Sequence, residues 1–338
     1  MRYSFIIPVY NRPEEVDELL NSLTRQTNKN FEVLVVEDGS SVPCKEVVDN
    51  YADRLDICYY FKSNSGPGQT RNYGAERGHG EYLIILDSDC ILPEGYLAAV
   101  ESELQQQKAD AFGGPDRAHD SFTNIQKAIN YAMTSFFTTG GIRGGKKKMD
   151  KFYPRSFNMG VRAEVYKALG GFSKMRFGED IDFSIRIFQG GYACRLFPEA
   201  WVWHKRRTDL KKFFKQVHNS GIARINLYKK YPKSLKVVHL LPALFTIGIV
   251  FLLLYSLVCS WSLSLLLLFA LIICVDSTLR NKSFKIGLLS ILASFIQLIG
   301  YGTGFLRAWW KRCVLGKNEF AAFAVSYTHL RAHETTLH

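Results

Sequence analysis

The chain has 338 residues, and because one ordinary domain has roughly 100–200 residues, we expect a catalytic-sized domain together with a second element. Hydrophobic residues make up 47% of the sequence and charged residues 22%, a balance that excludes an intrinsically disordered protein. The formal net charge is +12, and residues 204–236 hold eleven Lys and Arg against Asp209 alone, so the positive charge is concentrated in one segment.

Residues 1–200 alternate strand and helix patterns, which predicts an α/β fold. We expect a Rossmann-like, mostly parallel sheet with helices on both faces and a ligand crevice at the carboxyl ends of the strands. Met1–Tyr10 is too short and strand-like for a secretory signal, so we expect this part of the chain to stay inside the cell. The seven cysteines are scattered and include no C-x-x-C, which argues against a disulfide framework, so we expect them to be reduced. The predicted strands are residues 3–9, 31–36, 57–61 and 82–86, and the first predicted helix is residues 13–24.

Polar clusters follow three of these strands: Pro8-Val9-Tyr10-Asn11, Glu37-Asp38-Gly39-Ser40-Ser41 and Asp87-Ser88-Asp89. Each cluster alone is ordinary turn chemistry, but together they would line one edge of the sheet. Asp38 is suited to accept hydrogen bonds from a base or ribose hydroxyls. Asp87 and Asp89 share a face of extended backbone, so they either bind one hard cation such as Mg²⁺ or Mn²⁺ with a diphosphate, or are two exposed turn aspartates.

Two glycine-rich segments are candidates for contact with an anion. Gly66–Asn72 forms a flexible loop before a helix and offers Arg71 to a phosphate, although an Arg–Asp ion pair to the sheet edge explains it equally well. Gly140–Lys148 is a cationic loop that either closes over an anionic donor or is solvated.

Three carboxylates occur within four residues, at Glu179, Asp180 and Asp182, after an Asn158-Met159-Gly160 segment and a helical pattern at 162–169. Such a cluster is costly unless a cation, a hydrogen-bond network or water compensates it. It is either the acidic start of a helix or the site of a general base.

The composition changes at residue 237. Val237–Val258, Trp261–Val275 and Ile286–Leu306 contain no Asp, Glu, Lys or Arg, which predicts transmembrane helices rather than buried core helices. The basic flanks favour a hairpin for the first two segments with both ends in the cytoplasm. The third segment, with Gly300-Tyr301-Gly302-Thr303-Gly304 as an interruption, either crosses fully or is re-entrant or interfacial.

The predicted organisation has five parts. The basic segment could bind nucleic acid or anionic lipid by composition, and its position before a membrane segment favours lipid, so no nucleic-acid partner is expected. The last residues resemble translated adapter sequence and are excluded from the fold. The parts are a catalytic domain (1–210), a basic juxtamembrane segment (211–236), a membrane region of two to three segments (237–306), a basic membrane-proximal tail (307–323) and a non-native tail (324–338).

The order of these motifs strongly resembles glycosyltransferase family 2. The motifs are Pro-Val-Tyr-Asn, Glu-Asp-Gly-Ser-Ser, Gly-x-x-x-x-Arg-Asn-x-Gly, Leu-Asp-Ser-Asp, Asn-Met-Gly and Gly-Glu-Asp-Ile-Asp, between residues 2 and 210. The resemblance implies an A-type glycosyltransferase fold and a metal-dependent, inverting enzyme of the hexosyltransferase kind that takes its sugar from a nucleotide-diphosphate sugar. The Gln-x-x-Arg-Trp signature of processive members is absent after Asp180, which favours transfer of a single sugar.

The resemblance also implies a role for each matching residue. The matching positions contact the nucleoside (Pro8, Tyr10, Asp38), lie near the donor phosphates (Arg71), hold Mn²⁺ or Mg²⁺ with the diphosphate (Asp87, Asp89, and in some members His204), border the donor sugar and acceptor (Asn158, Met159, Gly160, with Glu179 beside them) and act as catalytic base (Asp180).

Position and family together suggest where the enzyme works. We expect a multi-pass protein of the bacterial inner membrane with a cytoplasmic catalytic domain, membrane lipids as partners, and a lipid-linked or envelope-glycan acceptor. The alternatives are a membrane-tethered scaffold that binds nucleotide sugars without catalysis, and a nucleotidyltransferase, which the lack of a Gly-rich, Lys-bearing loop near the N-terminus disfavours.

Overall fold

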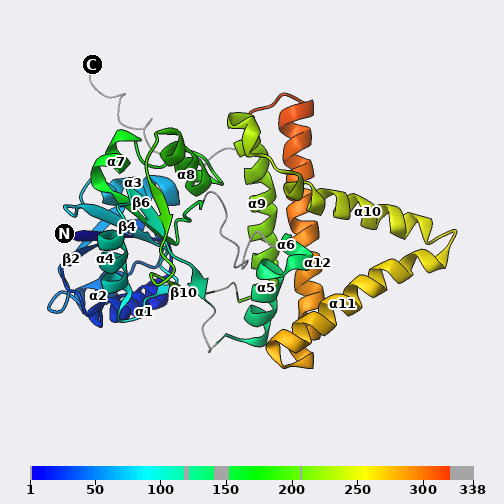
Figure 1. Ribbon diagram of the computed structural model, residues 1–338, viewed down its shortest axis with the longest axis horizontal. Helices are drawn as coiled ribbons and strands as arrows, with labels where there is room; N and C mark the ends of the chain where they lie inside the picture. The colour runs from blue at the N-terminus through cyan, green and yellow to red at the C-terminus, as the bar shows by residue number, and fades with distance from the viewer. Residues whose placement is uncertain (1, 118–121, 141–151, 206–207, 320–338) are drawn as a thin grey trace, which may run out of the picture. The chain divides into compact units, whose positions relative to one another are not determined.

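The computed structural model describes residues 2–117, 122–140, 152–205 and 208–319 (Figure 1). The chain forms two compact units. The first runs to Pro115 and from Tyr153 to Val202, and the second runs from Asp116 to Phe152 and from Trp203 to Glu319. The expected cationic loop at 140–148, apart from Gly140, and the tail at 324–338 lie outside the described residues.

The first unit is built on a seven-stranded sheet with the order β3-β2-β1-β4-β8-β6-β9. Neighbouring strands are parallel except for β8, which runs antiparallel to both β4 and β6. The prediction of a mostly parallel sheet is therefore confirmed, while the reversed strand was not predicted. The sheet strands are β1 (Tyr3–Val9), β2 (Phe31–Asp38), β3 (Ile57–Lys62), β4 (Tyr82–Leu86), β6 (Ala111–Gly113), β8 (Asn158–Arg162) and β9 (Cys194–Leu196), and three further short strands are β5 (Cys90–Ile91), β7 (Asp116–Arg117) and β10 (Val202–His204).

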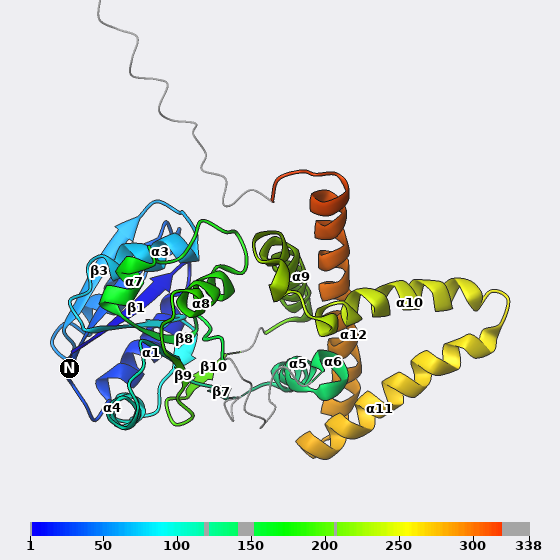
Figure 2. The ribbon, with the colours of Figure 1, turned by 45° about the horizontal axis from the view of Figure 1, so that its top comes forward.

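Helices cover both faces of this sheet, as the sequence predicts. Side chains alternate along a strand, so Phe5 and Ile7 of β1 pack in one hydrophobic core with α1, α2 and α4, while Ile6 packs in a second core with α7 and α8. Figure 2 shows α3 and α7 on one side of β1 and α1 and α4 on the other. These helices are α1 (Pro13–Thr24), α2 (Lys45–Asp49), α3 (Pro67–Ala75), α4 (Tyr96–Gln106), α7 (Ala163–Ala168) and α8 (Glu179–Gln189).

Helix α1 shows how closely the local sequence specifies an element. Pro13 stands at its first position, where a missing N–H costs nothing, and two glutamates in the first turn favour the positive end of the helix dipole. Its apolar residues are fully buried, and burying each such side chain stabilises the fold by about 1.5–3 kcal/mol. These are Val16, Leu19, Leu20 and Leu23.

The second unit is helical, and the long helix α12 contacts α5, α9, α10 and α11. Helices α10 and α11 form a hairpin joined through a 3₁₀ turn at Ser260–Leu263 (Figure 1). Among the described residues, two helical segments are long and apolar enough to cross a membrane, Ser260–Asn281 and Phe284–Val314, whereas Leu241–Tyr255 is shorter. The helices are α5 (Asn124–Thr134), α6 (Phe136–Thr139), α9 (Leu210–Lys230), α10 (Leu241–Tyr255), α11 (Ser264–Asn281) and α12 (Phe284–Trp309), and a π-helical turn at Trp310–Val314 extends α12.

The glycine-rich stretch expected to interrupt the third apolar segment does not do so, because α12 is continuous through it. Its glycines instead allow close helix packing. A Cβ added to Gly304 would lie 2.0 Å from the carbonyl oxygen of His218 in α9, and one added to Gly302 would lie 2.4 Å from the carbonyl oxygen of Pro242 in α10. The segment is therefore a packing surface within a helix rather than a break in it.

Candidate active site

The predicted polar clusters meet at one edge of the sheet. β1, β2 and β4 are parallel, so their carboxyl ends lie at the same side of the sheet. Asp38 is the last residue of β2, and Tyr10 and Asp87 directly follow β1 and β4. Because β8 is antiparallel to β4, with Asn158 opposite Leu86, the amino end of β8 joins that edge. The site is therefore assembled by strand direction, from residues far apart in the sequence.

The loops after β1 and β2 are tied together by Asn11. Its backbone lies in the left-handed region with φ 54°, and its N–H donates to Ser40 Oγ at 2.7 Å. Its side-chain oxygen accepts from the Val42 N–H at 2.9 Å. Pro8 is half-buried within β1, while the ring of Tyr10, 52% exposed, is accessible to a ligand such as a nucleoside.

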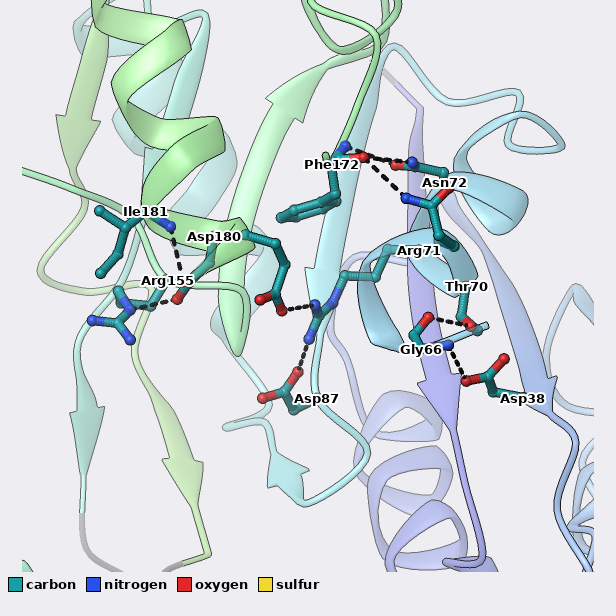
Figure 3. A network of polar contacts seen from close by, with 12 residues as sticks. Asp38, Gly66, Thr70, Arg71, Asn72, Asp87, Arg155, Phe172, Asp180 and Ile181 are labelled. Carbon is teal, nitrogen blue, oxygen red and sulfur yellow. Dashed lines mark hydrogen bonds and ion pairs between the residues drawn. The ribbon is translucent and has the colours of Figure 1, made fainter. Parts of the chain in front are cut away.

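Asp38 is buried and orders the turn before α3. Its carboxylate accepts from the N–H groups of Ser65 and Gly66, each at 2.9 Å, and pairs with Lys62 (Figure 3). Gly66 has φ 88°, a backbone conformation that favours glycine, directly before Pro67 starts the helix. Asp38 thus positions the loop that carries Arg71, and its expected contact with a nucleoside stays a prediction.

Arg71 lies between two carboxylates rather than facing open solvent. Its guanidinium donates to Asp87 Oδ1 at 2.8 Å and to Glu179 Oε1 at 3.2 Å, and its side chain is 4% exposed (Figure 3). Burial alone would lower the pKa of Arg71, but Asp87 and Glu179 raise it above its ordinary value. The structure shows the ion pair to the sheet edge, which also joins the end of β4 to the start of α8. The expected place of Arg71 near the donor phosphates stays a prediction.

The second aspartate after β4, Asp89, is buried beside Arg12, whose Nη1 lies 2.7 Å from Asp89 Oδ2. Burial alone would lower the pKa of Arg12, and the charge of Asp89 raises it overall. The sequence analysis gave Arg12 no role. Its place directly after the Pro-Val-Tyr-Asn cluster was the available signal, because β1 and β4 are neighbours in the sheet.

Asp180 is held at the start of α8 by two donors. Arg155 Nε lies 2.6 Å from its Oδ2, and the N–H of Ile181 donates to its Oδ1 at 2.8 Å (Figure 3). Burial raises the pKa of this carboxyl, but Arg155, the Ile181 N–H and Arg71 together hold the pKa below its ordinary value. Asp180 is therefore ionised at neutral pH, as a general base must be.

Glu179 has the opposite electrostatics although it is adjacent. Burial and the charge of Asp180 raise its pKa, and Arg71 opposes that rise. Asp182 is fully buried, accepts from Ser173 Oγ at 2.8 Å and pairs with Arg186 at 3.0 Å. Each carboxylate of the cluster thus pairs with a different arginine, so a cation is among the means of compensation, together with hydrogen bonds from Ser173 and Ile181.

The Asn158-Met159-Gly160 segment forms part of the sheet. The Tyr96 hydroxyl donates to Asn158 Oδ1 at 2.6 Å, and Asn158 Nδ2 donates to the carbonyl of Ala200 at 2.8 Å. Met159 is fully buried, and a Cβ on Gly160 would lie 2.0 Å from the Phe112 ring. These side chains form a rigid wall beside the site, and their expected proximity to the donor sugar and acceptor stays a prediction.

Asn72, next to Arg71, had no assigned role in the sequence analysis. Its side chain accepts from the Phe172 N–H at 2.8 Å and donates to the Phe172 carbonyl at 2.9 Å (Figure 3). The ring of Phe172 lies 5.3 Å from the guanidinium of Arg71. Asn72 therefore fixes the loop before α8 that places Arg71 between its carboxylates.

His204 ends β10 in the second unit, two residues after Val202 ends the first, and its expected role as a metal ligand stays a prediction. Asp87 and Asp89 lie in the turn between β4 and β5, and their carboxylate oxygens are the type of donor that a hard divalent cation prefers. The side chain of Asp87 is 32% exposed, which leaves it accessible to an ion and a diphosphate.

Comparison with known proteins identifies this arrangement. Residues 4–170 match the family model described as Glycosyl transferase family 2, a range that contains the sheet-edge residues from Tyr10 to Asn158. The chain belongs to glycosyltransferase family 2.

Two relatives and one solved structure illustrate the likeness to other glycosyltransferases. An uncharacterized glycosyltransferase of Rickettsia felis is 32% identical over 40% of this chain and 22% of its own length, so the chain spans about a fifth of that relative. Glycosyltransferase AglE of Haloferax volcanii is 27% identical over 70% of this chain and 79% of its own. The mannosyltransferase PcManGT of Pyrobaculum calidifontis, solved with GDP-Man and Mn²⁺, shares the fold with a TM-score of 0.63, 19% identity, and coverage of 90% and 87%.

Proposed function

We propose that this protein transfers a single sugar from a nucleotide-diphosphate sugar to an acceptor hydroxyl, with inversion at the anomeric carbon. The observation that carries this proposal is the ionised Asp180 at the sheet edge, held by Arg155 and the Ile181 N–H beside the Arg71–Asp87 pair. Membership of family 2 and the nucleotide-sugar complex of the structural neighbour support it.

Inversion requires one displacement, in which the acceptor oxygen bonds to the anomeric carbon as the bond to the diphosphate breaks. Asp180 takes the proton of the acceptor hydroxyl, a step that contributes about 10²–10⁴ in rate. Each carboxylate oxygen has two lone pairs, so the hydrogen bonds from Arg155 and Ile181 still leave acceptor capacity for that hydroxyl. Arg155 and the helix start fix the orientation of the base.

The residues proposed to bind the donor lie on the Asp87 side of Arg71, opposite Glu179. Asp87 and Asp89 would hold Mn²⁺ or Mg²⁺ with the donor diphosphate, and the bound metal supplies positive charge that stabilises the departing diphosphate. Arg71 orients Asp87, and Arg12 orients Asp89. Pro8, Tyr10 and the loop ordered by Asp38 would border the nucleoside.

The acceptor is proposed to be lipid-linked or an envelope glycan, reached at the cytoplasmic face of a bacterial membrane. The apolar helices of the second unit support membrane association, and the basic α9 is suited to anionic headgroups.

The test is turnover by Asp180→Asn in the full chain, measured as release of nucleoside diphosphate from the donor and as transfer to a membrane extract. We expect a loss of 10²-fold or more in turnover with donor affinity unchanged, because the amide cannot take a proton. The matched control is Asp209→Asn, an aspartate that caps α9 by accepting from the Lys212 N–H. Unchanged turnover in Asp180→Asn would remove it from the base role, and donor binding without any turnover in the unmodified protein would favour a nucleotide-sugar-binding scaffold.

A further inference from the structure

The hairpin of α10 and α11 exposes an apolar surface that only a non-aqueous partner can cover. No Asp, Glu, Lys or Arg occurs from Val237 to Val275, and α10 has no polar face. The most exposed apolar side chains lie at the tip of the hairpin: Leu257 is 84% exposed, Val258 86% and Trp261 82%. An apolar surface of this extent marks a site of membrane or protein contact.

The arms of the hairpin are held apart by packing against α12. The rings of Phe245 in α10, Phe269 in α11 and Phe295 in α12 contact one another with centroids 5.4–5.8 Å apart. The three helices thus form a triangle whose tip lies farthest from α12 (Figure 1). The hairpin is thus a wedge anchored on α12, and its exposed side chains are apolar.

The distribution of charge selects lipid as the partner. Exposed basic residues stand at both ends of the hairpin and none stands at its tip, which suits anionic headgroups around the base and acyl chains around the tip. A protein interface would instead have a polar rim around an apolar centre. The basic residues are Lys233 and Lys236 before α10, Arg280 in the last turn of α11, Lys282 directly after α11 and Lys285 at the start of α12.

The neighbours of α12 argue against its crossing the bilayer. α9 runs parallel to its carboxyl-terminal half, since His218 contacts Thr303 at 3.2 Å and Asn226 contacts Arg312 at 2.7 Å. If α12 crossed, α9 would lie at the same depth with its exposed lysines, and charged side chains at the bilayer centre are unfavourable. The exposed lysines of α9 are Lys211, Lys212, Lys215, Lys229 and Lys230.

The shorter arm of the hairpin limits its depth. The 15 residues of α10 span about 22 Å at 1.5 Å per residue, less than the hydrocarbon core of about 30 Å. We propose that the α10–α11 hairpin enters one leaflet of a lipid bilayer from the side of its basic ends and does not cross it, while α9 and α12 lie among the headgroups. This differs from the multi-pass arrangement expected from the sequence, and it is independent of the proposed enzymatic function.

The test uses the full chain in sealed vesicles of phosphatidylethanolamine and phosphatidylglycerol. One variant carries Leu257→Cys at the tip, with Cys58, Cys194, Cys259 and Cys313 changed to serine; the buried Cys44, Cys90 and Cys274 stay. The matched control keeps Cys58, an exposed cysteine of β3, as its only accessible thiol. A membrane-impermeant maleimide is supplied outside and then, by freezing and thawing, on both sides.

We expect the control to be labelled fully and the tip cysteine to react at least tenfold more slowly until detergent is added. Labelling of the tip at the rate of Cys58 would show that it reaches an aqueous face, by crossing or by staying outside, and would overturn the proposal. A tip that stays unreactive in detergent would be covered by protein, for example a second copy, and would overturn it as well.

A second measurement avoids the cysteine substitutions. Lipids brominated midway along the acyl chain should quench the fluorescence of the unmodified protein more strongly than that of Trp261→Phe. Equal quenching of the two proteins would place Trp261 outside the leaflet and contradict the proposal.

Discussion

Adjacent residues at the start of α8 acquire different acid–base properties from their neighbours. Arg155 lowers the pKa of Asp180, whereas burial and Asp180 raise that of Glu179. A site that separates the pKa values of two carboxyls in this way assigns them different roles. Asp180 is suited to be the base, and Glu179 to position Arg71.

Arg155→Gln tests the cause of the low pKa of Asp180. The base acts when deprotonated, so turnover falls as the pH drops through its pKa, and removing Arg155 raises that pKa and moves the acidic limb of the pH profile to higher pH. The measurement is donor turnover from pH 4 to 9. Arg162→Gln is the matched control, because Arg162 is similarly exposed, 36% against 38%, but pairs with Asp110 and Glu164. An unshifted acidic limb in Arg155→Gln would contradict this account of Asp180.

Arg71→Met should strongly destabilise the first unit. It leaves Glu179 buried without its cation, and breaking a buried pair in this way costs about 3–5 kcal/mol. Since the folded-state pKa of Glu179 is already raised, and rises further without Arg71, the loss of stability should be larger at pH 8 than at pH 5, where Glu179 takes up a proton more easily. Thermal unfolding at the two pH values measures it.

Arg77→Met is the control for Arg71→Met. Arg77 lies just after α3, the helix that contains Arg71, but it pairs on the surface with the exposed Glu76. Equal losses in Arg71→Met and Arg77→Met would show that burial of the Arg71 pair has no special effect.

The sequence predicts that the acidic cluster needs compensation by a cation, a hydrogen-bond network or water, because three carboxylates occur within four residues. Which arginines supply the cations could not be predicted. Arg155 and Asp180 are 25 residues apart and Arg12 and Asp89 are 77 apart, and both pairs depend on the order and direction of strands.

At the scale of elements, local patterns predicted β1, α1 and β4 with the bounds they have in the structure. β1 and β4 are short apolar runs and are buried almost throughout, and the buried residues of α1 recur at helical spacing. Local patterns did not predict β8. The segment contains residues that favour turns and flexibility, Asn158 and Gly160, on either side of Met159. It forms a strand because β4 and β6 pair with it on both sides. Tertiary pairing decided that element.

Gly304→Ala tests the role of glycine in α12. The new Cβ would lie 2.0 Å from the carbonyl oxygen of His218, so α9 and α12 must separate, and overpacking of this kind costs about 1–3 kcal/mol. Gly248→Ala in α10 is the control, because no atom lies within 4 Å of its added Cβ and alanine gains up to about 1 kcal/mol in helix propensity. We expect the melting temperature to fall in Gly304→Ala alone; no difference between the variants would mean that α9 and α12 are not closely packed.

At the scale of the whole molecule, the chain leaves the first unit at Pro115 and returns to it at Tyr153, and the intervening α5 packs with α12. From the sequence we predicted one domain for residues 1–210, because the composition does not change between Pro115 and Tyr153. The core of Ala128, Ile129, Phe213, Val217 and Ala293 joins segments from three parts of the chain, and such long-range packing has no local signal.

The central claim is that the sheet edge holds a nucleotide-diphosphate sugar through metal-binding carboxylates, and donor-dependent thermal stabilisation of the full chain tests it most directly. UDP-, GDP- and dTDP-sugars would be compared in Mn²⁺, Mg²⁺ and EDTA for the unmodified protein, Asp180→Asn and Asp89→Asn. We predict that one donor family stabilises the first two proteins in the presence of metal, and that EDTA or Asp89→Asn removes the effect. Stabilisation by no donor, or equal stabilisation in EDTA and in Asp89→Asn, would contradict the account.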